Sequence, residues 1–441
     1  MTVFAGKRVL VAGAGVSGRS VARVLDRLGA AVTVTDANAE RLAGLPGTAR
    51  PGLTEPPDGT DLVVTSPGWR PDSPLLLAAE RAGVEVIGDV ELAWRVAEHP
   101  SWLAVTGTNG KTTTVGMLES ILRAAGVDAV ACGNVGLPVI DAVLAGTEVL
   151  AVELSSFQLH WQSSLRPKAA VVLNVAEDHL DWHGSLDDYA AAKGRIYAGA
   201  ELALYNADDV WSTLLAVGHP NPVGFTLDEP GEHRFGVVDG WLVDGDDRLA
   251  EVADVPAPGL HNVANALAAA ALARCYGVRP TAVRDGLVAF RPGGHRATLV
   301  GEWQNIRYVN DSKATNPHAA AGSLGAYPSV VWLVGGQLKG ASIDNLIADA
   351  AARLRGVVVL GADRDLISAA LARHAPQIPT YQVGPGDDEP MMAAVRAAKD
   401  LARPGDVVLL APAAASLDMF TDYAARGDAF AEAVRRLHEA G

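Results

Sequence analysis

Cysteine is scarce in this sequence, and basic residues are fewer than acidic ones. The 441 residues include 2 cysteines, Cys132 and Cys275, which excludes a disulfide framework and a zinc site built on cysteine. The 51 acidic and 36 basic residues give a formal net charge of −15, which disfavours general binding to nucleic acid or to an anionic membrane. A phosphate-bearing ligand must therefore be bound by local basic side chains and backbone N–H groups.

Long apolar runs are also missing. We find no stretch of about twenty consecutive apolar residues, and the start MTVFAGKRVL lacks the apolar segment of a signal peptide. We therefore expect a cytoplasmic protein without membrane insertion. Hydrophobic residues still make up 49% of the chain and charged residues 20%, which is typical of a globular protein with a large core. The length exceeds what one core usually serves, so two or three domains are expected.

Short runs rich in valine and leucine alternate with alanine-rich helical patterns almost throughout. This alternation predicts an α/β protein with parallel sheets. The first block holds the predicted strands RVLVAG, AVTVTD, DLVVTS and VEVIGD. The second holds WLAVTG, EVLAVELS and AAVVLNV, followed by a helical pattern that begins at His261. The third holds VVWLVGG, GVVVLG and DVVLLAP. Proline and glycine interrupt the pattern near ELAWRVAEHPSW and FRPGGHR, which predicts domains at residues 1–95, 96–292 and 293–441.

The first glycine-rich segment, Gly13 to Gly18, lies between a predicted strand and a predicted helix. Its G-x-G-x-x-G pattern permits a tight turn and the close approach of a diphosphate to the helix N-terminus. Asp36, which ends the next predicted strand, could accept hydrogen bonds from a ribose or a base. An ordinary surface turn is the alternative, and NAD is only one of several nucleotide diphosphates with this geometry. TSPGWRPDSP, residues 65–74, forms a second loop at the carboxyl end of a strand.

The second glycine-rich segment has the chemistry of a site for the phosphates of ATP. It consists of Gly107, Thr108, Asn109, Gly110, Lys111, Thr112 and Thr113. It is a shortened relative of the Walker A pattern, because Val105 occupies the position of that pattern's first glycine. Its backbone N–H groups can surround phosphate oxygens, Lys111 can neutralise the β- and γ-phosphates, and the Thr112 hydroxyl can reach Mg²⁺. The alternative is an ordinary loop that contains glycine. We predict ATP as the co-substrate.

Candidate metal ligands follow two later predicted strands. Glu153 ends a strand that is predicted to be buried, and a buried carboxylate needs a partner such as Mg²⁺, a helix N-terminus or a basic side chain. The segment NVAEDHLDWHG offers Asp178, His179, Asp181 and His183, and spacing does not choose among them. Lys193 lies on a predicted helix, and from the residues alone we interpret it as part of a solvated helix face.

Nine motifs occur in a fixed order along the chain. They are GTNGKTTT, GNVG, ELSSFQL, NVAEDHLD, YAAAKGRIY, GLHNVANALAA, GGHR, NDSKATNP and AAASLDMF. Together they resemble the ATP-dependent Mur ligases of peptidoglycan synthesis over nearly the whole chain. The segment NDSKATN and the form of the N-terminal domain are most similar to the members that add D-glutamate.

The resemblance implies three domains. It implies a Rossmann-like N-terminal domain for the UDP part of the substrate, a central ATP-binding domain of the P-loop ATPase type, and a Rossmann-like C-terminal domain for D-glutamate. The glycine turn of Gly13 would then face the UDP diphosphate, Asp36 would lie near the uracil, and NAD is discarded. Ala37 stands where some relatives have a hydroxyl residue, so one uracil contact differs.

The resemblance also assigns roles residue by residue. It implies four catalytic residues, Lys111, Glu153, His179 and Lys193. Two Mg²⁺, or Mn²⁺ in their place, would be bound by Thr112, Glu153, His179 and Lys193, with His183 a bystander. Lys193 would act as a carbamate, which forms when CO₂ adds to a neutral amine and offers anionic oxygen. ATP would also meet Asn262, Asn265, Arg296 and Asp311.

The two other substrates have their own implied residues. The UDP-substrate would be bound by Gly15, Val16, Ser17, Asp36, Ser66, Pro67, Gly68, Asn134, Ser155 and Gln158. D-Glutamate would be bound by Lys313, Thr315, Lys339, Ser416, Leu417 and Tyr423. Lysines suit this amino acid because it carries two carboxylates. Tyr423 stands where an aromatic residue, often phenylalanine, is expected.

The implied reaction is amide formation between UDP-N-acetylmuramoyl-L-alanine and D-glutamate through an acyl phosphate, by a monomer acting on small molecules. The first alternative is a sister ligase, another Mur enzyme or a folylpolyglutamate synthetase, with a different amino acid. The second is an NAD-dependent oxidoreductase built on the Gly13 turn, which leaves the ATP residues unexplained. The third is a catalytically silent protein that binds a UDP-sugar.

Overall fold

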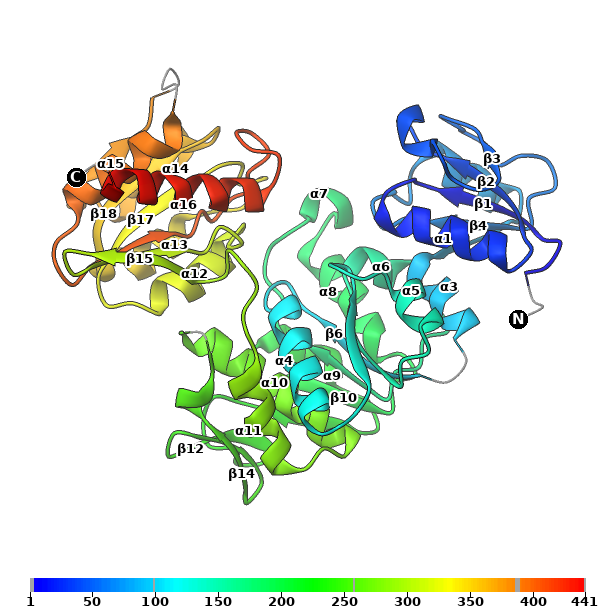
Figure 1. Cartoon of the computed structure of the whole chain (residues 1–441), viewed down its shortest axis with the longest axis horizontal. Helices are drawn as coiled ribbons and strands as arrows, with labels where there is room; N and C mark the ends of the chain where they lie inside the picture. Colours follow the sequence, from blue (N-terminus) through cyan, green and yellow to red (C-terminus); the bar gives the residue numbers. More distant parts are fainter. Residues whose placement is uncertain (1–3, 98–99, 257, 385–388, 440–441) are drawn as a thin grey trace. The chain divides into compact units, whose positions relative to one another are not determined.

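The computed structural model describes residues 4–97, 100–256, 258–384 and 389–439 (Figure 1). Its strands form three sheets. The chain forms two compact units. The first comprises Met1–Val175, Trp182–Asp254 and Asn265–Phe290, and the second comprises Ala176–Asp181, Val255–Ala264 and Arg291–Gly441. No helix of the described part is long and apolar enough to cross a membrane.

The first sheet is entirely parallel and has the order β3-β2-β1-β4-β5. Its strands are β1 (Arg8–Ala12), β2 (Ala31–Thr35), β3 (Thr48–Ala49), β4 (Leu62–Thr65) and β5 (Glu85–Gly88), with helices α1 (Val16–Arg27), α2 (Pro74–Arg81) and α3 (Asp89–Val96). The four strands predicted for this block are confirmed, and the two-residue β3 was not predicted. The strand order reverses at β1, so the loops after β1 and β4 leave the same sheet edge next to each other.

The second sheet has nine strands in the order β14-β13-β12-β11-β10-β9-β6-β8-β7. Its parallel strands are β6 (Ser101–Thr106), β7 (Ala129–Gly133), β8 (Val149–Glu153), β9 (Ala169–Val172), β10 (Leu202–Asn206), β11 (Pro222–Phe225) and β12 (Phe235–Val238), and β13 (Trp241–Asp244) and β14 (Asp247–Glu251) continue it antiparallel. The predicted strands β6, β8 and β9 are confirmed. We did not predict the hairpins of β12 to β14, although the turns Asp239-Gly240 and Gly245-Asp246 carry a recognisable turn signal.

Eight helices accompany this sheet among the described residues. They are α4 (Lys111–Ala124), α5 (Val139–Leu144), α6 (Ser156–His160), α7 (Leu180–His183), α8 (Leu186–Gly194), α9 (Val210–Ala216), α10 (Leu260–Tyr276) and α11 (Pro280–Ala289). The helical pattern predicted from His261 is confirmed as α10. The phosphate-loop candidate therefore lies between β6 and α4, where a strand passes into a helix.

The third sheet has the order β15-β16-β20-β17-β18-β19, parallel except for the hairpin of β15 and β16. Its strands are β15 (Thr298–Trp303), β16 (Ile306–Asn310), β17 (Val330–Gly335), β18 (Leu354–Leu360), β19 (Thr380–Gln382) and β20 (Val407–Leu410). Its helices are α12 (Pro317–Gly325), α13 (Asp344–Ala350), α14 (Arg364–His374), α15 (Pro390–Leu401) and α16 (Tyr423–Glu439).

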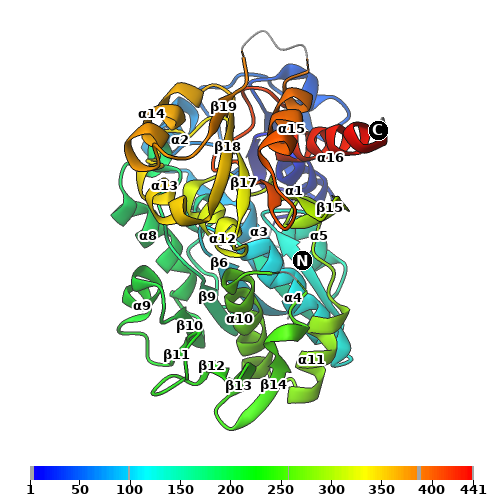
Figure 2. The ribbon, with the colours of Figure 1, turned by 90° about the vertical axis from the view of Figure 1, so that its left-hand side faces the viewer.

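Helices cover both faces of the third sheet. In Figure 2, α13 and α14 lie on one side of β17 and β18, and α15 and α16 lie on the other. Trp332 of β17 packs in the core on the α13 and α14 side, whereas Val331 and Leu333 pack against α15 and α16. A strand buried on both faces has no polar side, which is why VVWLV reads as one continuous apolar run.

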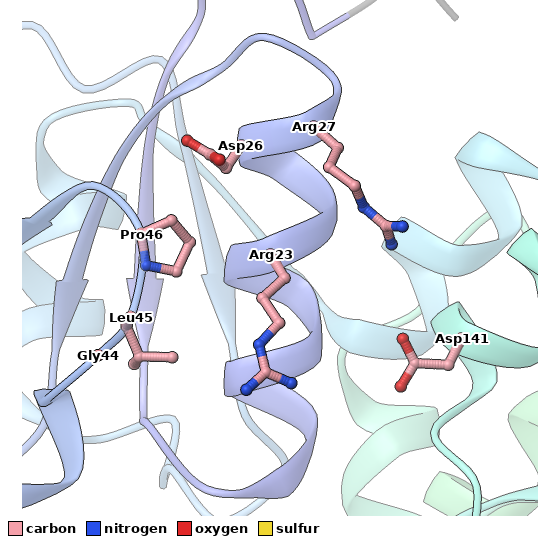
Figure 3. A pocket seen from close by; sticks show the side chains of 7 residues that line it. All are labelled: Arg23, Asp26, Arg27, Gly44, Leu45, Pro46 and Asp141. Carbon is pink, nitrogen blue, oxygen red and sulfur yellow. The ribbon is translucent and has the colours of Figure 1, made fainter.

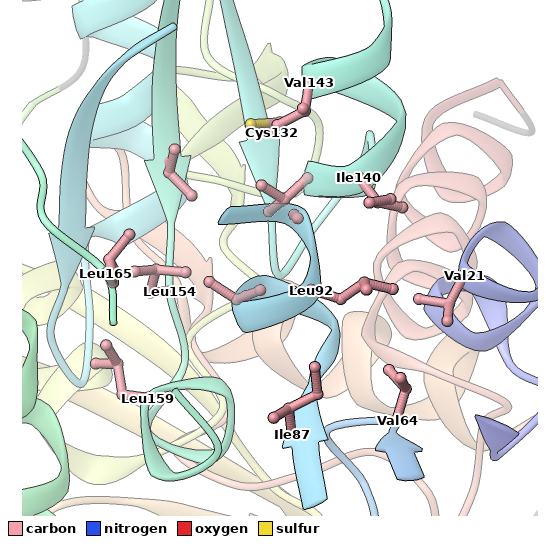
Figure 4. Close-up of a cluster of buried hydrophobic side chains, with 14 of the residues drawn as sticks. Val21, Val64, Ile87, Leu92, Cys132, Ile140, Val143, Leu154, Leu159 and Leu165 are labelled. Atoms are coloured by element: carbon pink, nitrogen blue, oxygen red, sulfur yellow. The ribbon is translucent and has the colours of Figure 1, made fainter. Parts of the chain in front are cut away.

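The first two sheets share one continuous core. Figure 4 shows Val21 of α1, Leu92 of α3 and Ile140 of α5 in a single cluster of buried side chains. This shared core explains why both sheets belong to one compact unit. The predicted boundary between residues 95 and 96 falls in the last turn of α3, which ends at Val96. Residues 98–99 of the predicted junction lie outside the described residues, as do residues 1–3. The three sheets are consistent with the predicted three-domain plan, and its boundaries stay a prediction.

Glu91 connects α3 to the loop after α6. Its side chain is fully buried, and its carboxylate accepts hydrogen bonds from Ser163 N (2.9 Å), Ser164 N (3.0 Å), Ser164 Oγ (2.7 Å) and Arg95 Nε (2.8 Å). Burial by itself would raise the pKa of this carboxyl, but the hydrogen bonds outweigh burial and lower the pKa to about 2. The ionised form is therefore stabilised by the fold.

We expect Glu91→Gln to lower the free energy of unfolding at pH 7 by about 2 to 3 kcal/mol. The contribution of Glu91 is fully present above the unfolded pKa of 4.5 and is lost as pH falls through the folded pKa of about 2. The difference between wild type and variant should therefore shrink over that pH window. Thermal unfolding at several pH values measures it. Glu85→Gln is the control, because Glu85 pairs with the same Arg95 but is 55% exposed, and an equal effect there would contradict the prediction.

Candidate functional site

The glycine turn after β1 is packed against the loop after β4. Gly13 has φ +103, and a Cβ atom there would lie 2.6 Å from Ser66 Oγ. At Gly18, a Cβ atom would lie 1.9 Å from the carbonyl oxygen of Gly13. Both positions therefore require glycine. The Ser66 hydroxyl donates to Gly13 O at 3.4 Å. The two segments predicted to bind the UDP-substrate, residues 15–17 and residues 66–68, therefore lie together at one edge of the sheet.

Asp36 holds this turn in place. The side chain is buried, and its carboxylate accepts hydrogen bonds from Ala14 N (2.8 Å) and Asn38 N (2.9 Å). Both carboxylate oxygens therefore already have a backbone donor. The structure thus gives Asp36 a role in shaping the glycine turn, and its predicted position near a uracil stays a prediction.

The phosphate-loop candidate joins β6 to α4, and its lysine folds back onto the loop. Gly110 precedes α4 with φ +86, and a Cβ atom there would lie 2.2 Å from Asn265 Oδ1. Lys111 Nζ donates to Gly107 O (2.8 Å) and Thr108 O (3.0 Å). Carbonyl oxygens thus hold the ammonium group beside the loop that is expected to bind phosphate.

Two residues that we did not predict support the loop. Asn174, just after β9, accepts from Thr108 N and Asn109 N at 2.9 Å each, and its amide donates to Asn109 O at 3.2 Å. The hydroxyl groups of Thr108 and Tyr189 lie 3.3 Å apart. β9 neighbours β6 in the sheet, and this adjacency is what brings Asn174 to the loop. Motif spacing alone does not reveal it.

Glu153 has one carboxylate oxygen without a hydrogen-bond partner among the described residues. It ends β8 and is 2% exposed. Its Oε1 accepts from Asn134 Nδ2 at 3.1 Å, whereas Oε2 is buried and has no hydrogen-bond partner within the described structure. Buried acceptors are almost always satisfied, and a hard cation such as Mg²⁺ binds carboxylate oxygens. Glu153 therefore fits the predicted metal site.

The metal-binding side chains of the described residues can be compared with the predicted donor set. Among the residues that the structure describes, no three His, Cys, Asp or Glu side chains form a group that could hold a metal ion. This is compatible with the predicted donor set, which also counts a threonine hydroxyl and a modified lysine. The expected metal would then depend on oxygens from its substrates.

Lys193 is the clearest correction to our interpretation from the residues alone. It is 1% exposed, so the interpretation as a solvated helix face is wrong. Its Nζ donates to Gly107 O at 2.9 Å and lies 4.3 Å from the centre of the Tyr189 ring. The helix α8 exposes Asp187 and Asp188 and buries Tyr189, Ala190, Ala192 and Lys193. The residues next to Lys193 in sequence are small, so no apolar stripe marks its side of the helix as buried. Lys193 and Lys111 thus donate to the same carbonyl oxygen.

The four candidates of the segment after β9 separate into two groups. Asp178 and His179 belong to the second compact unit, where His179 Nε2 lies 3.7 Å from Asp178 Oδ2, which accepts from Asn316 Nδ2 at 3.2 Å. Asp181, which also belongs to the second unit, and His183, which belongs to the first, are residues of α7. His183 Nε2 lies 2.9 Å from Ser156 Oγ, and its ring stacks on Phe157. The choice of His179 as a metal ligand stays a prediction.

The two predicted asparagines both lie on α10 and are buried, each 6% exposed. Asn265 accepts from Thr114 Oγ1 at 3.4 Å and faces Gly110. Asn262 Nδ2 donates to Pro258 O at 2.8 Å. Asn265 therefore supports the phosphate loop directly, and contact of either asparagine with adenine stays a prediction.

Asp89 is a site residue that we did not predict. Ser155 and Gln158 form a capping box at the start of α6, and Gln158 Nε2 donates to Asp89 Oδ2 at 3.4 Å. Burial raises the pKa of Asp89, opposed by hydrogen bonds from Gln158 and Ser17. Asp89 therefore connects the glycine turn of the first sheet to the ELSSFQL motif of the second. Its position as the last residue of the predicted strand VEVIGD is the available signal.

The residues predicted to bind D-glutamate follow three strands that are neighbours in the third sheet, β16, β20 and β17. Lys313 Nζ lies 4.1 Å from the centre of the Tyr423 ring. Ser416 is buried, whereas Leu417 and Lys339 are exposed. Thr315 N donates to Lys313 O at 2.8 Å. The carboxyl ends of these parallel strands thus place the predicted residues at one edge of the sheet.

Two predicted ATP residues precede this group. Asp311 accepts hydrogen bonds from Ala297 N (3.2 Å) and from the Ser323 hydroxyl. Burial raises the pKa of Asp311. Arg296 is half-buried. These contacts anchor Asp311 to α12, and binding of ATP by Arg296 and Asp311 stays a prediction.

A pocket of about 740 Å³ lies away from all predicted site residues (Figure 3). It is lined by Arg23, Asp26, Arg27, Gly44, Leu45, Pro46 and Asp141. Asp141 accepts from Ser20 Oγ at 2.7 Å. Two arginines and two aspartates give the pocket mixed charge, so it has no preference for an anion.

Comparison with known proteins decides the family. Residues 105–273 match the model of the Mur ligase middle domain, and residues 295–414 match the Mur ligase, glutamate ligase domain. The chain is 56% identical to the UDP-N-acetylmuramoylalanine--D-glutamate ligase of Streptomyces avermitilis, with 99% of this chain and 100% of that protein covered. The chain belongs to the Mur ligase family.

Other Mur ligases agree with this placement. The enzyme of the same printed name from Mycobacterium tuberculosis is 49% identical, with 98% of this chain and 96% of that protein covered. The crystal structure of the UDP-N-acetylmuramate-alanine ligase from Thermotoga maritima is 20% identical with a TM-score of 0.63, covering 99% of this chain and 100% of that one. At that identity the structural match shows the fold alone. The first sheet lies outside the two matched models but within the full-length relatives.

Proposed function

We propose that this Mur ligase joins D-glutamate to UDP-N-acetylmuramoyl-L-alanine at the expense of ATP, in the cytoplasm and as a monomer. The observation that carries the proposal is the meeting of Lys111 and Lys193 at Gly107 O in a glycine-rich loop between strand and helix. Glu153 lies on the neighbouring strand, in register with Val105, and one of its oxygens has no partner in the described part of the chain. Relatives 49–56% identical over nearly their whole length carry the name of this activity, which supports the pair of substrates.

The proposed reaction solves the problem that a carboxylate is a poor electrophile. The L-alanine carboxylate attacks the γ-phosphorus of ATP, which forms an acyl phosphate and releases ADP. The amine of D-glutamate then attacks the acyl carbon, a tetrahedral intermediate forms, and phosphate leaves as the amide is completed. The amine loses one proton in this step. The enzyme's contribution is mainly alignment and neutralisation of charge.

Lys111 has the clearest role in the first step. Two anions, the carboxylate and the γ-phosphate, must come into contact, and at about 4 Å their repulsion is on the order of 1 kcal/mol in water and several times larger in a drier site. The Lys111 ammonium, now held by two carbonyl oxygens, would exchange them for phosphate oxygens. Bound Mg²⁺ or Mn²⁺, with Thr112, Glu153, His179 and carbamylated Lys193 as the predicted ligands, would supply further positive charge at the phosphates.

The proposed carbamate on Lys193 has a physical reason in the loop. Two ammonium groups that share one carbonyl oxygen repel each other. Loss of a proton from the Lys193 ammonium, followed by addition of CO₂ to the neutral amine and loss of a second proton, would replace one of these cations with an anion beside Lys111. The similarity to the matched relatives supports the activity, and the carbamate is a further part of this proposal.

The first and third sheets supply the other two substrates in this proposal. The order β3-β2-β1-β4-β5 is that of the first strands of a dinucleotide-binding sheet, and the N-terminus of α1 suits a diphosphate. This supports binding of UDP at the Gly13 turn. Lys313 and Lys339 would meet the two carboxylates of D-glutamate, with Thr315 and Ser416 beside them.

Mass spectrometry of the products tests the proposal. The purified protein is incubated with ATP, Mg²⁺, UDP-N-acetylmuramoyl-L-alanine and D-glutamate, and we expect one D-glutamyl product for each ADP released. Parallel reactions with L-alanine, a diamino acid or L-glutamate separate it from sister ligases and folylpolyglutamate synthetases. Absence of the D-glutamyl product, or faster ADP release with another amino acid, would contradict the proposal. Tight binding of NADH would favour the oxidoreductase alternative.

A further inference from the structure

Arg426, in the first turn of α16, is a buried cation outside the predicted site residues. Its side chain is among the largest fully buried ones and is 1% exposed. Nε donates to Ser312 Oγ (3.0 Å) and Nη2 to Ser312 O (2.9 Å). Nη1 donates to Ala414 O (2.9 Å) and Gly335 O (3.3 Å). One guanidinium group therefore binds three separate segments of the chain.

These three segments are the ones that carry the proposed D-glutamate site. Ser312 follows β16 and directly precedes Lys313. Gly335 ends β17, and Lys339 lies in the loop that follows. Ala414 follows β20, two residues before Ser416. Because the strand order is β16-β20-β17, the rigid guanidinium fork spans three neighbouring strand ends.

All the acceptors of Arg426 are neutral. They are three carbonyl oxygens and one hydroxyl, and no carboxylate among the described residues lies within 4.0 Å of the guanidinium as an ion pair. Burial lowers the pKa of Arg426 to about 10, with the charge of Asp418 acting in the opposite direction. The side chain therefore stays cationic at neutral pH. A buried cation whose direct hydrogen-bond acceptors are neutral favours binding of an anion nearby.

We infer that Arg426 is the positioning residue of the D-glutamate pocket. It holds the loops after β16, β17 and β20 in fixed relation, and its positive charge favours an amino acid with a second carboxylate over a neutral analogue. This inference depends on the proposed function, because it assigns a further determinant to the same amino acid site. Arg426 acts through the residues it binds and through its charge.

Steady-state kinetics of two variants test this role. Arg426→Lys keeps the charge but cannot span three strand ends, and Arg426→Met removes the charge as well. For Arg426→Lys we expect the KM for D-glutamate to rise about tenfold, a change that corresponds to one lost polar contact or more. The KM values for ATP and for the UDP-substrate should change less than about twofold. For Arg426→Met we expect, in addition, that the preference for D-glutamate over uncharged D-glutamine falls by about tenfold.

Controls separate positioning from general instability. Arg436→Lys, on the same helix, alters an exposed pair with Glu389 and should leave every KM unchanged. If Arg426→Met does not fold, Ser312→Ala removes the hydroxyl that accepts from Nε and should raise the KM for D-glutamate about threefold. Three KM values that rise together, or an unchanged KM for D-glutamate, would overturn the inference. Failure of the proposed function is a different result, because wild type would then make no D-glutamyl product.

Discussion

Replacing Lys193 with alanine is expected to lower kcat by about a thousandfold or more, as loss of a central electrostatic group does. The reason is the position of its ammonium group on Gly107 O, 2.9 Å away, inside the phosphate-loop region. If Lys193 acts as a carbamate, added formate or acetate should restore part of the activity by supplying the missing carboxylate. Product formation is measured by mass spectrometry with and without these acids.

A second substitution at the same position separates charge from carbamate. Lys193→Arg keeps a cation, but a guanidinium group stays protonated and does not form the carbamate. This variant should therefore be inactive as well, and added CO₂ should not change its activity. Lys168→Ala is the matched control, because Lys168 also lies over a tyrosine ring, that of Tyr276 at 5.2 Å, and is outside the proposed site. Full activity of Lys193→Ala, or of Lys193→Arg, would remove the carbamate from the mechanism.

The second large effect is expected at Lys111. We expect Lys111→Ala to lower formation of the acyl phosphate by about a thousandfold or more, because the loop then lacks the cation that neutralises the γ-phosphate. Trapping of the activated carboxylate with hydroxylamine measures this step without D-glutamate. The fold should be retained, since Lys111 is half-buried and its acceptors are carbonyl oxygens of its own loop.

Binding measurements show whether the loss at Lys111 is specific. The affinity for UDP-N-acetylmuramoyl-L-alanine should be unchanged in Lys111→Ala, whereas the affinity for ATP should fall. Thr113→Ser, a change in the first turn of α4 that keeps a hydroxyl, is the control and should retain most activity. Hydroxylamine trapping at the wild-type rate in Lys111→Ala would show that the loop does not bind the γ-phosphate as proposed.

The strands with the clearest signal in the sequence are those buried on both faces. β6, β8, β17 and β20 are almost entirely buried, so their apolar runs are uninterrupted. The strands that we missed are short or partly exposed. β19 has three exposed residues, and β15 has no buried one. Such strands are stabilised by their neighbours in the sheet, and local composition gives them little signal.

Some residues of the candidate site could also be predicted from the sequence, and others could not. The phosphate-loop residues were recognisable because their chemistry lies within one segment of consecutive residues. Glu153 was recognisable because it ends an apolar strand. The burial of Lys193 could not be predicted from its own helix, because its neighbours in sequence are small and α8 also exposes two aspartates, and Asp89 lies outside the predicted site residues. The burial of Lys193 depends on residues 86 positions away along the chain.

The sequence by itself was therefore sufficient to predict the α/β class, the three groups of strands and the glycine turns, because each of these depends on residues that are neighbours in the chain. Folding in three dimensions decided which distant groups meet. It brought Lys111 and Lys193 to one oxygen, Asp89 between Ser17 and Gln158, and Arg426 across three strand ends. These contacts follow from the order of the strands within each sheet and from the helices that pack on the sheets. Periodicity records which face of an element is buried and carries no information about its neighbour.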